Sequence, residues 1–190
     1  MSHILLHRVY YPVTTLGPGC RLGIWVQGCD RDCPGCLSPE MQPRTGNPTE
    51  VCEVLRRIPD DIHPDGLTIS GGEPFDQPQA VAEIAEWFAS RYGEDILVYT
   101  GYTLQELRAR KDPHTDRLLE RVAALVDGPY MQDRNNGRGL AGSNNQRLYL
   151  YRCADRYRDA CALPRRLQAA GQGNRLLLIG IPPKDTKGEG

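Results

Sequence analysis

Cys29, Cys33 and Cys36 are the residues whose types and spacing most clearly indicate chemistry. They form a CxxxCxxC pattern within the segment GCDRDCPGC. Three closely spaced thiolates can surround one compact inorganic core where the chain turns sharply, and the glycines and proline of this segment supply such turns. A cubane of four irons needs four ligands, so three cysteines leave one iron open to a small molecule. The pattern predicts a four-iron four-sulfur cluster, with a zinc knuckle completed by Cys20 or Cys52 as the alternative.

A second candidate is the turn Gly71-Gly72-Glu73-Pro74. Two glycines let the backbone approach a ligand closely, and the carboxylate of Glu73 can accept hydrogen bonds from an ammonium group. By itself the turn fits an ordinary strand-to-helix connection in which a proline opens the helix. The 35 residues from Cys36 to Gly71 match one strand–helix unit, however, so the two loops are expected to lie side by side.

Strands and helices alternate in the elements that must position these residues. Strands are predicted at 22–28, 66–72, 95–101, 123–128 and 147–152, and helices at 48–58, 78–93, 103–110 and 115–123. Short apolar strands separated by helices of these lengths indicate an α/β fold with a parallel sheet. In such folds the carboxyl ends of the strands carry the chemistry, so four strand ends, at 28–29, 71–73, 100–101 and 127–128, are expected to converge on one site.

The composition limits the classes of function. The chain has 190 residues with 23 basic and 24 acidic side chains, which argues against general binding to nucleic acid or to an anionic membrane. We see no secretory signal, and the longest apolar stretch, residues 176–181, is too short to span a bilayer. Seven cysteines, an odd number, favour reduced thiols in the cytoplasm over a closed disulfide framework.

The cysteine pattern after one strand and GGEP after the next together resemble the radical S-adenosylmethionine (SAM) superfamily. The resemblance implies a partial (βα) barrel and a four-iron cluster held by Cys29, Cys33 and Cys36. It also implies that SAM chelates the open iron, while Gly71, Gly72 and Glu73 form the turn that holds its methionine end. One electron through the cluster would then cleave SAM to methionine and a 5′-deoxyadenosyl radical.

Further segments resemble the glycyl-radical-enzyme activases, and most closely those that activate anaerobic ribonucleotide reductase. These segments are GPGCR (17–21), YTGYTLQEL (99–107), LVDGPY (125–130) and GSNNQR (142–147). The resemblance implies a core over 1–152, followed by a carboxyl-terminal extension and polar tail over 153–190. It implies two partners: a protein substrate that receives a glycyl radical, and a one-electron donor such as flavodoxin or ferredoxin.

Two other functions stay open from the sequence. One is a stand-alone radical SAM enzyme that modifies a peptide or a small metabolite. If residues 153–181 closed the open face of the barrel, a large protein substrate could not enter, and this alternative would be favoured. The other is a metal-binding module without catalysis.

Several residues have weaker predicted roles. Thr100 and Asp127, at strand ends, are candidates for contact with the ribose of SAM. Residues 143–146 could bind substrate or SAM, or form a plain turn. Cys153 and Cys161 could join Cys52 or Cys20 in a second cluster, although free thiols are the simpler interpretation. The arginine-rich region 147–175 could dock an acidic partner or nucleotide phosphates, although a solvated helix face is the simpler interpretation.

Overall fold

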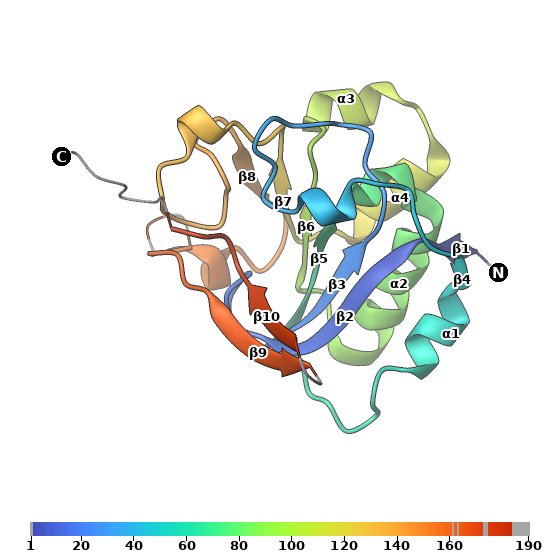
Figure 1. Cartoon of the computed structure of the whole chain (residues 1–190). Coiled ribbons are helices and arrows are strands. Elements are labelled where there is room, and N and C mark those ends of the chain that lie inside the picture. The colour runs from blue at the N-terminus through green and yellow to red at the C-terminus, as the bar shows by residue number, and fades with distance from the viewer. Residues whose placement is uncertain (1, 161, 163, 173–174, 184–190) are drawn as a thin grey trace.

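A six-stranded sheet runs through the centre of the computed structural model, which describes residues 2–160, 162, 164–172 and 175–183 (Figure 1). The strands lie in the order β2-β3-β5-β6-β7-β8. They are β2 (Leu6–Val13), β3 (Arg21–Val26), β5 (Gly66–Gly71), β6 (Ile96–Tyr99), β7 (Ala124–Asp127) and β8 (Arg147–Leu150). The α/β class and five of these strands were predicted from the sequence, whereas β2 was not.

The prediction of a parallel sheet is right for the centre and wrong at both edges. Strands β3, β5, β6 and β7 are parallel to one another, whereas β2 pairs antiparallel with β3, and β8 antiparallel with β7. A parallel connection needs a crossover segment, usually a helix. Residues 14–20 and 128–146, which lead to β3 and to β8, contain no α-helix. The sheet is therefore mixed.

Four α-helices connect the parallel strands, as predicted, with small shifts at their ends. They are α1 (Val51–Arg56), α2 (Pro78–Tyr92), α3 (Leu104–Ala109) and α4 (Pro113–Arg121). The start of α4 comes earlier than expected because Asp112 caps it, accepting hydrogen bonds from the backbone N–H groups of His114 and Thr115. Pro113 follows at the first helical position, where its missing N–H costs nothing. No described helix has the length and apolar character needed to cross a membrane.

The remaining elements are short. Strand β1 (His3–Ile4) pairs with β4 (Thr49–Glu50) beside α1. Single turns of 3₁₀ helix occur at η1 (Pro39–Met41), η2 (Pro74–Asp76), η3 (Gln132–Arg134) and η4 (Ala154–Tyr157). The turns η1 and η2 follow the cysteine loop and the glycine turn, so both candidate segments end in compact structure.

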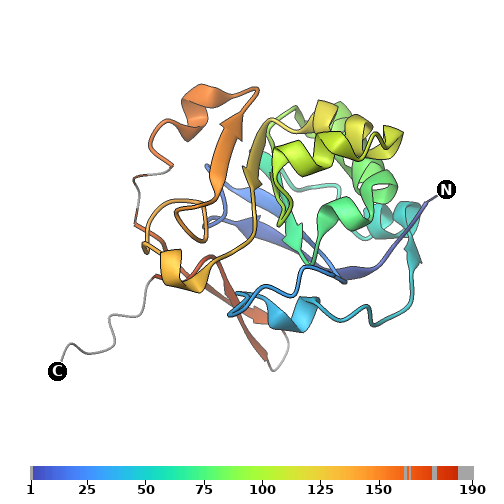
Figure 2. The ribbon, with the colours of Figure 1, turned by 90° about the horizontal axis from the view of Figure 1, so that it is seen from above.

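The two faces of the sheet are covered by different parts of the chain. The main core, which includes Ile24, Ile69 and Val98, packs against the helices. On the opposite face, Trp25 belongs to a smaller cluster together with Ile179 of a hairpin formed by β9 (Gln168–Gln172) and β10 (Arg175–Ile179). Figure 2 shows the helices and this hairpin on opposite sides of the sheet. The alternation of side chains along each strand produces this division.

Two clasps of polar contacts join the carboxyl-terminal extension to the rest of the chain. At the amino ends of the strands, the fully buried guanidinium of Arg21 donates to Thr68 Oγ1 (2.7 Å) and pairs with Asp95 (3.1 Å). Tyr157, from the extension, donates to the same Asp95 carboxylate (2.5 Å). The arginine of the predicted GPGCR segment therefore organises the closed end of the sheet, far from the cysteine loop.

Arg165 forms the second clasp. Its guanidinium donates to Asn135 Oδ1 (2.7 Å) and to the carbonyl oxygens of Ala141 (2.5 Å), Gly142 (3.0 Å) and Pro182 (3.1 Å). The extension is thus packed on the core. The polar tail, residues 184–190, lies outside the described residues.

Candidate functional site

The cysteine loop begins where β3 ends, and backbone hydrogen bonds shape it. Gly28 N–H donates to the carbonyl of Met41 (2.8 Å), and Cys36 N–H donates to that of Cys33 (3.1 Å). Gly28 and Gly35 have φ angles of 98° and 70°, a region in which a side chain is strained. The prediction that glycines turn this loop is therefore confirmed.

Cys29, Cys33 and Cys36 are free, half-buried thiols on the wall of one cavity. Burial raises the pKa of Cys29 to about 11 and also raises the pKa of Cys36. A negative charge on Cys33 adds to both shifts. Two N–H groups, of Arg31 and Ser38, point at the sulfurs of Cys29 (3.5 Å) and Cys36 (3.4 Å). Such donors stabilise a thiolate ligand once a metal replaces its proton.

These thiols are not arranged for a single metal ion. Within the described part of the chain, no three His, Cys, Asp or Glu side chains are close enough to share one ion. Cys20 precedes β3 and Cys29 follows it, so a six-residue strand, roughly 20 Å long, separates the proposed fourth zinc ligand from the loop. The thiol of Cys52 donates a hydrogen bond to the carboxylate of Glu50 (3.3 Å), and Cys52 does not line the cavity.

The glycine turn lies directly against the cysteine loop, as predicted. Gly72 N–H donates to Val26 O, and Glu73 N–H donates to Gly28 O, both at 2.8 Å. A Cβ on Gly72 would lie 2.2 Å from Gly28 O, and one on Gly71 would lie 2.4 Å from Val26 O. Close packing of the two loops therefore requires both glycines, whether or not a ligand is bound.

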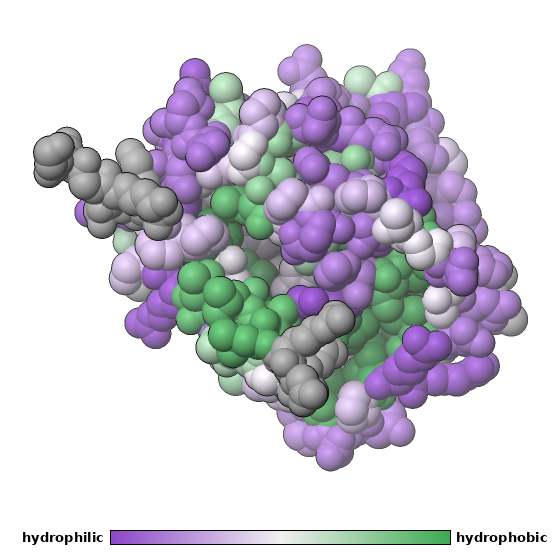
Figure 3. Space-filling view, in the orientation of Figure 1, coloured by the Kyte–Doolittle hydropathy of each residue, from purple (hydrophilic) through white to green (hydrophobic). Residues whose placement is uncertain are grey.

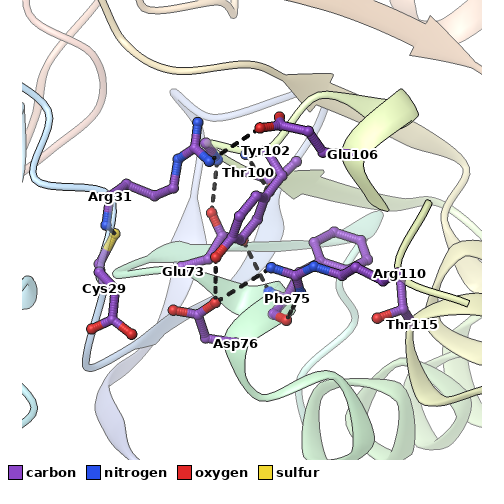
Figure 4. A network of polar contacts seen from close by, with 12 residues as sticks. Cys29, Arg31, Glu73, Phe75, Asp76, Thr100, Tyr102, Glu106, Arg110 and Thr115 are labelled. Carbon is purple, nitrogen blue, oxygen red and sulfur yellow. Dashed lines mark hydrogen bonds and ion pairs between the residues drawn. The ribbon is translucent and has the colours of Figure 1, made fainter. Parts of the chain in front are cut away.

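Glu73 is almost fully buried, and its carboxylate joins three segments (Figure 4). Its Oε1 accepts from Phe75 N–H (2.9 Å) and from Thr100 Oγ1 (2.8 Å), while its Oε2 accepts from Gly101 N–H (2.8 Å). Burial raises the pKa of Glu73 to about 7, against the lowering effect of these hydrogen bonds. Thr100, predicted near the ribose of SAM, is thus a direct partner of Glu73 and lines the same cavity.

A stack of cationic and aromatic groups supports the cysteine loop from the side of α3, and no sequence pattern predicted it. The ring of Tyr102 lies between the guanidinium groups of Arg31 (4.5 Å from its centroid) and Arg110 (3.9 Å), as Figure 4 shows. Its hydroxyl donates to Asp76 (2.9 Å), and Arg31 also pairs with Glu106 (3.5 Å). Contacts of this kind fix the loop through groups other than its thiols.

A second tie holds the other flank of the loop. Arg44 bridges Asp30 (2.6 Å), next to Cys29, and Asp76 (2.9 Å), next to the glycine turn. Arg44 and Asp30 are exposed, which limits the contribution of their pair, whereas Asp76 is largely buried.

The cavity between these segments has a volume of about 480 Å³. The cysteine loop, the glycine turn and the residue pair 100–101 form its walls, together with Gly142, Gln146 and the end of the hairpin at 176–181. Tyr99 also lines it, and the buried hydroxyl of Tyr99 has no hydrogen-bond partner among the described residues. Three of the four predicted strand ends therefore meet at one cavity.

The fourth predicted strand end, at residues 127–128, does not line the cavity and instead positions the start of α3. Asp127 is buried, accepts a hydrogen bond from Leu104 N–H (2.7 Å) at the start of α3, and does not line the cavity. In the 143–146 segment, Gln146 accepts from Gly142 N–H and donates to Gly128 O, both at 2.8 Å. Ser143 accepts from the N–H of residue 131. Most polar groups of this segment thus hold the loop itself.

One cysteine of the alternative second cluster, Cys161, lies outside the described residues. Cys153 is exposed, and Cys20, Cys52 and Cys153 form no ligand group within the part of the chain that is described.

The chain matches the family described as "4Fe-4S single cluster domain" over residues 15–149. It is 34% identical, over 150 residues, to the anaerobic ribonucleoside-triphosphate reductase-activating protein of Salmonella typhimurium, with 74% of this chain and 95% of that protein covered. The Escherichia coli protein of the same name is 34% identical over 151 residues with the same coverage. The chain belongs to this family of activating proteins. The Enterobacteria phage T4 relative in the family is 26% identical over 148 residues and covers 75% of this chain and 91% of its own.

Membership of the activating-protein family confirms the resemblance to the radical SAM activases, and with it an iron–sulfur enzyme of the activating type. The match to the iron–sulfur domain spans the cysteine loop, the glycine turn and the strand ends of the cavity. It ends at residue 149, so the hairpin β9–β10 lies outside it.

Proposed function

We propose that this chain uses Cys29, Cys33 and Cys36 to hold one 4Fe-4S cluster, at which SAM is reductively cleaved to install a glycyl radical on an anaerobic ribonucleotide reductase. The observation that carries the proposal is the meeting of three free thiols, the glycine turn and Thr100 on one cavity, in a chain of this family. In this proposal the mixed sheet is a partial (βα) barrel whose strand ends carry the reaction.

The residues present fit both groups. A cavity of about 480 Å³ falls in the range of small-molecule sites, roughly 300–1,000 Å³. Three thiols give a cluster one ligand too few, which is the arrangement that leaves an iron open to a chelating substrate. The unpartnered hydroxyl of Tyr99 offers a further donor within the cavity.

A cluster held by Cys29, Cys33 and Cys36 would supply the one electron that breaks a carbon–sulfur bond of SAM, which would give methionine and a 5′-deoxyadenosyl radical. Glu73 orients the methionine end: its Oε2 accepts a single hydrogen bond in the structure and can take another from the ammonium group. Burial of Glu73 strengthens this contact and keeps water out.

Gly71 and Gly72 hold the turn against the cysteine loop, so that the ammonium acceptor and the thiols keep a fixed separation. Thr100 orients Glu73 through its hydroxyl and remains a candidate for the ribose. Asp127 does not line the cavity, so nothing there supports its predicted contact with the ribose. It accepts a hydrogen bond from Leu104 N–H and so positions the start of α3.

The proposed partners are the reductase and a one-electron donor, flavodoxin or ferredoxin. The names of the relatives support the first, and the resemblance to activases supports the second. The cytoplasm is the proposed location, which agrees with the free state of every described cysteine.

Anaerobic reconstitution tests the proposal directly. The wild-type chain should bind about four irons, cleave SAM when reduced, and give a glycine-centred doublet in electron paramagnetic resonance when mixed with an anaerobic ribonucleotide reductase. Cys33→Ala should lose iron and cleavage together, whereas the control Cys52→Ala should keep both.

Three results would contradict the proposal. Zinc in place of iron in the reconstituted protein would favour a binding module without catalysis. Cleavage retained in Cys33→Ala would refute the ligand assignment. SAM cleavage without a glycyl radical on any reductase would favour the stand-alone alternative.

A further inference from the structure

Among the residues that the structure describes, strand β10 has one unpaired edge and an exposed apolar face. It pairs with β9 along one edge, and no described strand pairs with the other. In an antiparallel strand, alternate residues direct their N–H and C=O groups to each edge, so the free edge offers hydrogen bonds to another extended chain. Leu176 and Leu178 are 73% and 59% exposed, more than any other large apolar side chain described.

This edge borders the candidate active site. Residues 176–181 line the same cavity as the three cysteines and the glycine turn. In Figure 3 a hydrophobic patch lies beside a hollow on the face where Figure 1 places β10. A chain paired with β10 would therefore run along the edge of this cavity.

The hairpin is firmly attached, so the exposure of its leucines is a property of a fixed surface. Thr15 Oγ1 donates to Ile179 O (3.0 Å), and Gln168 Nε2 donates to Pro12 O (2.7 Å). Ile179 is buried in the cluster around Trp25. One face of β10 is thus packed against the sheet while the other is presented to a partner.

The chemistry of the occupant follows from the reaction. A glycine has no side chain to recognise, so a site that acts on glycine has to hold it through its backbone. Pairing with the edge of a strand does this, with affinity from main-chain hydrogen bonds and selectivity from neighbouring side chains. The chain's own tail, KDTKGEG, has no large apolar side chain to cover the two leucines.

We propose that β10 is a docking strand, on which an extended segment of the protein substrate pairs through its backbone and covers Leu176 and Leu178. The inference rests on the proposed function, in which the substrate is a protein that receives a glycyl radical. Because the family match ends at residue 149, this surface is an addition to the iron–sulfur domain.

The test measures how much glycyl radical forms on the reductase for each SAM that is cleaved. The reconstituted Leu176→Glu/Leu178→Glu variant is mixed with the reductase, and the glycyl radical formed per SAM cleaved is compared with wild type. Two buried leucines support an expected loss of roughly tenfold or more. The matched control is Leu167→Glu, a leucine 42% exposed that precedes β9 and does not line the cavity.

Hydrogen exchange gives a second readout that does not depend on activity. Adding the reductase to wild-type protein should slow exchange at the β10 amides that point to the free edge. An unchanged yield of glycyl radical per SAM cleaved in the double variant would overturn the inference, as would β10 amides that the reductase fails to protect. A wild-type dimer that the double variant dissociates would identify a second copy as the occupant and would also overturn it. Failure of wild type to form any glycyl radical would instead count against the proposed function.

Discussion

Glu73 shows how one residue can link three parts of a site. The sequence indicated its chemistry, because a carboxylate beside two glycines at a strand end is a recognisable pattern. Its partners Thr100 and Gly101 could not be predicted, since that contact depends on how β5 and β6 align in the sheet. The glycines were predicted to admit a ligand, and the structure shows that they also admit the neighbouring loop.

The first prediction at this scale concerns Gly72. In Gly72→Ala the new Cβ would overlap Gly28 O and push the cysteine loop away, at a cost of about 1–3 kcal/mol. Iron bound after reconstitution should fall several-fold. In the control Gly171→Ala, the added Cβ meets no atom within 4 Å, so iron content should match wild type. Equal iron in both variants would show that the two loops do not depend on this contact.

The second prediction uses the pKa of Glu73, which is about 7 in the folded chain and has an ordinary value of 4.5. Between these values the folded state holds a proton that the unfolded state releases. The contribution of Glu73 to the free energy of unfolding should therefore be complete below about pH 4.5 and be lost as pH rises through 7. For the metal-free protein this contribution is on the order of 1–3 kcal/mol. Urea unfolding between about pH 5 and pH 8 should show a steeper decline in wild type than in Glu73→Gln. Parallel declines would mean that Glu73 titrates normally.

At the scale of elements, the parallel strands and their helices were predictable because each carries a clear apolar pattern. Strand β2 was missed because most of its residues are half-buried without regular alternation. The hairpin was missed because its first strand, QAAGQ, has little intrinsic preference for β structure. Its conformation depends instead on packing against Trp25 and on contacts with residues 12–15, more than 150 positions away.

The element-scale prediction concerns Arg165, which holds the extension to the 135–142 loop. Arg165→Met should lower the free energy of unfolding by about 2 kcal/mol, because several carbonyl acceptors lose a charged donor. Limited proteolysis should cut the extension sooner than in wild type. The neighbouring exposed Arg166 donates no described side-chain hydrogen bond, so Arg166→Met is the control. Identical digestion of both variants would rule out a clasp.

At the scale of the whole molecule, the two ends of the sheet have separate tasks. The carboxyl ends hold the thiols and the cavity, while the amino ends are closed by the buried Arg21 and Asp95 with Tyr157. The sequence associated the GPGCR segment with the family but did not show that its arginine lies at the opposite end from the cysteines.

The prediction at this scale is that Arg21→Met destabilises the fold without changing the site. Asp95 keeps its ion pair with Arg156 (2.7 Å), but Thr68 Oγ1 and the buried carbonyl oxygens of Leu67 and Asp95 lose a charged donor, which costs about 2–3 kcal/mol. Iron bound per folded chain should stay at the wild-type level. Arg158, whose side chain is 75% exposed in its pair with Asp155, provides the control, and Arg158→Met should cost well under about 1 kcal/mol. Loss of iron without loss of stability would assign Arg21 to the site instead.

The stack of Arg31, Tyr102 and Arg110 has a consequence for how the protein recovers from exposure to air. Its members hold the cysteine loop through contacts that involve none of the three thiols. Loss of the proposed cluster to oxygen would therefore leave the cysteine loop in its folded conformation. We expect the same chain to rebuild the cluster from iron and sulfide once a reductant has restored the three thiols.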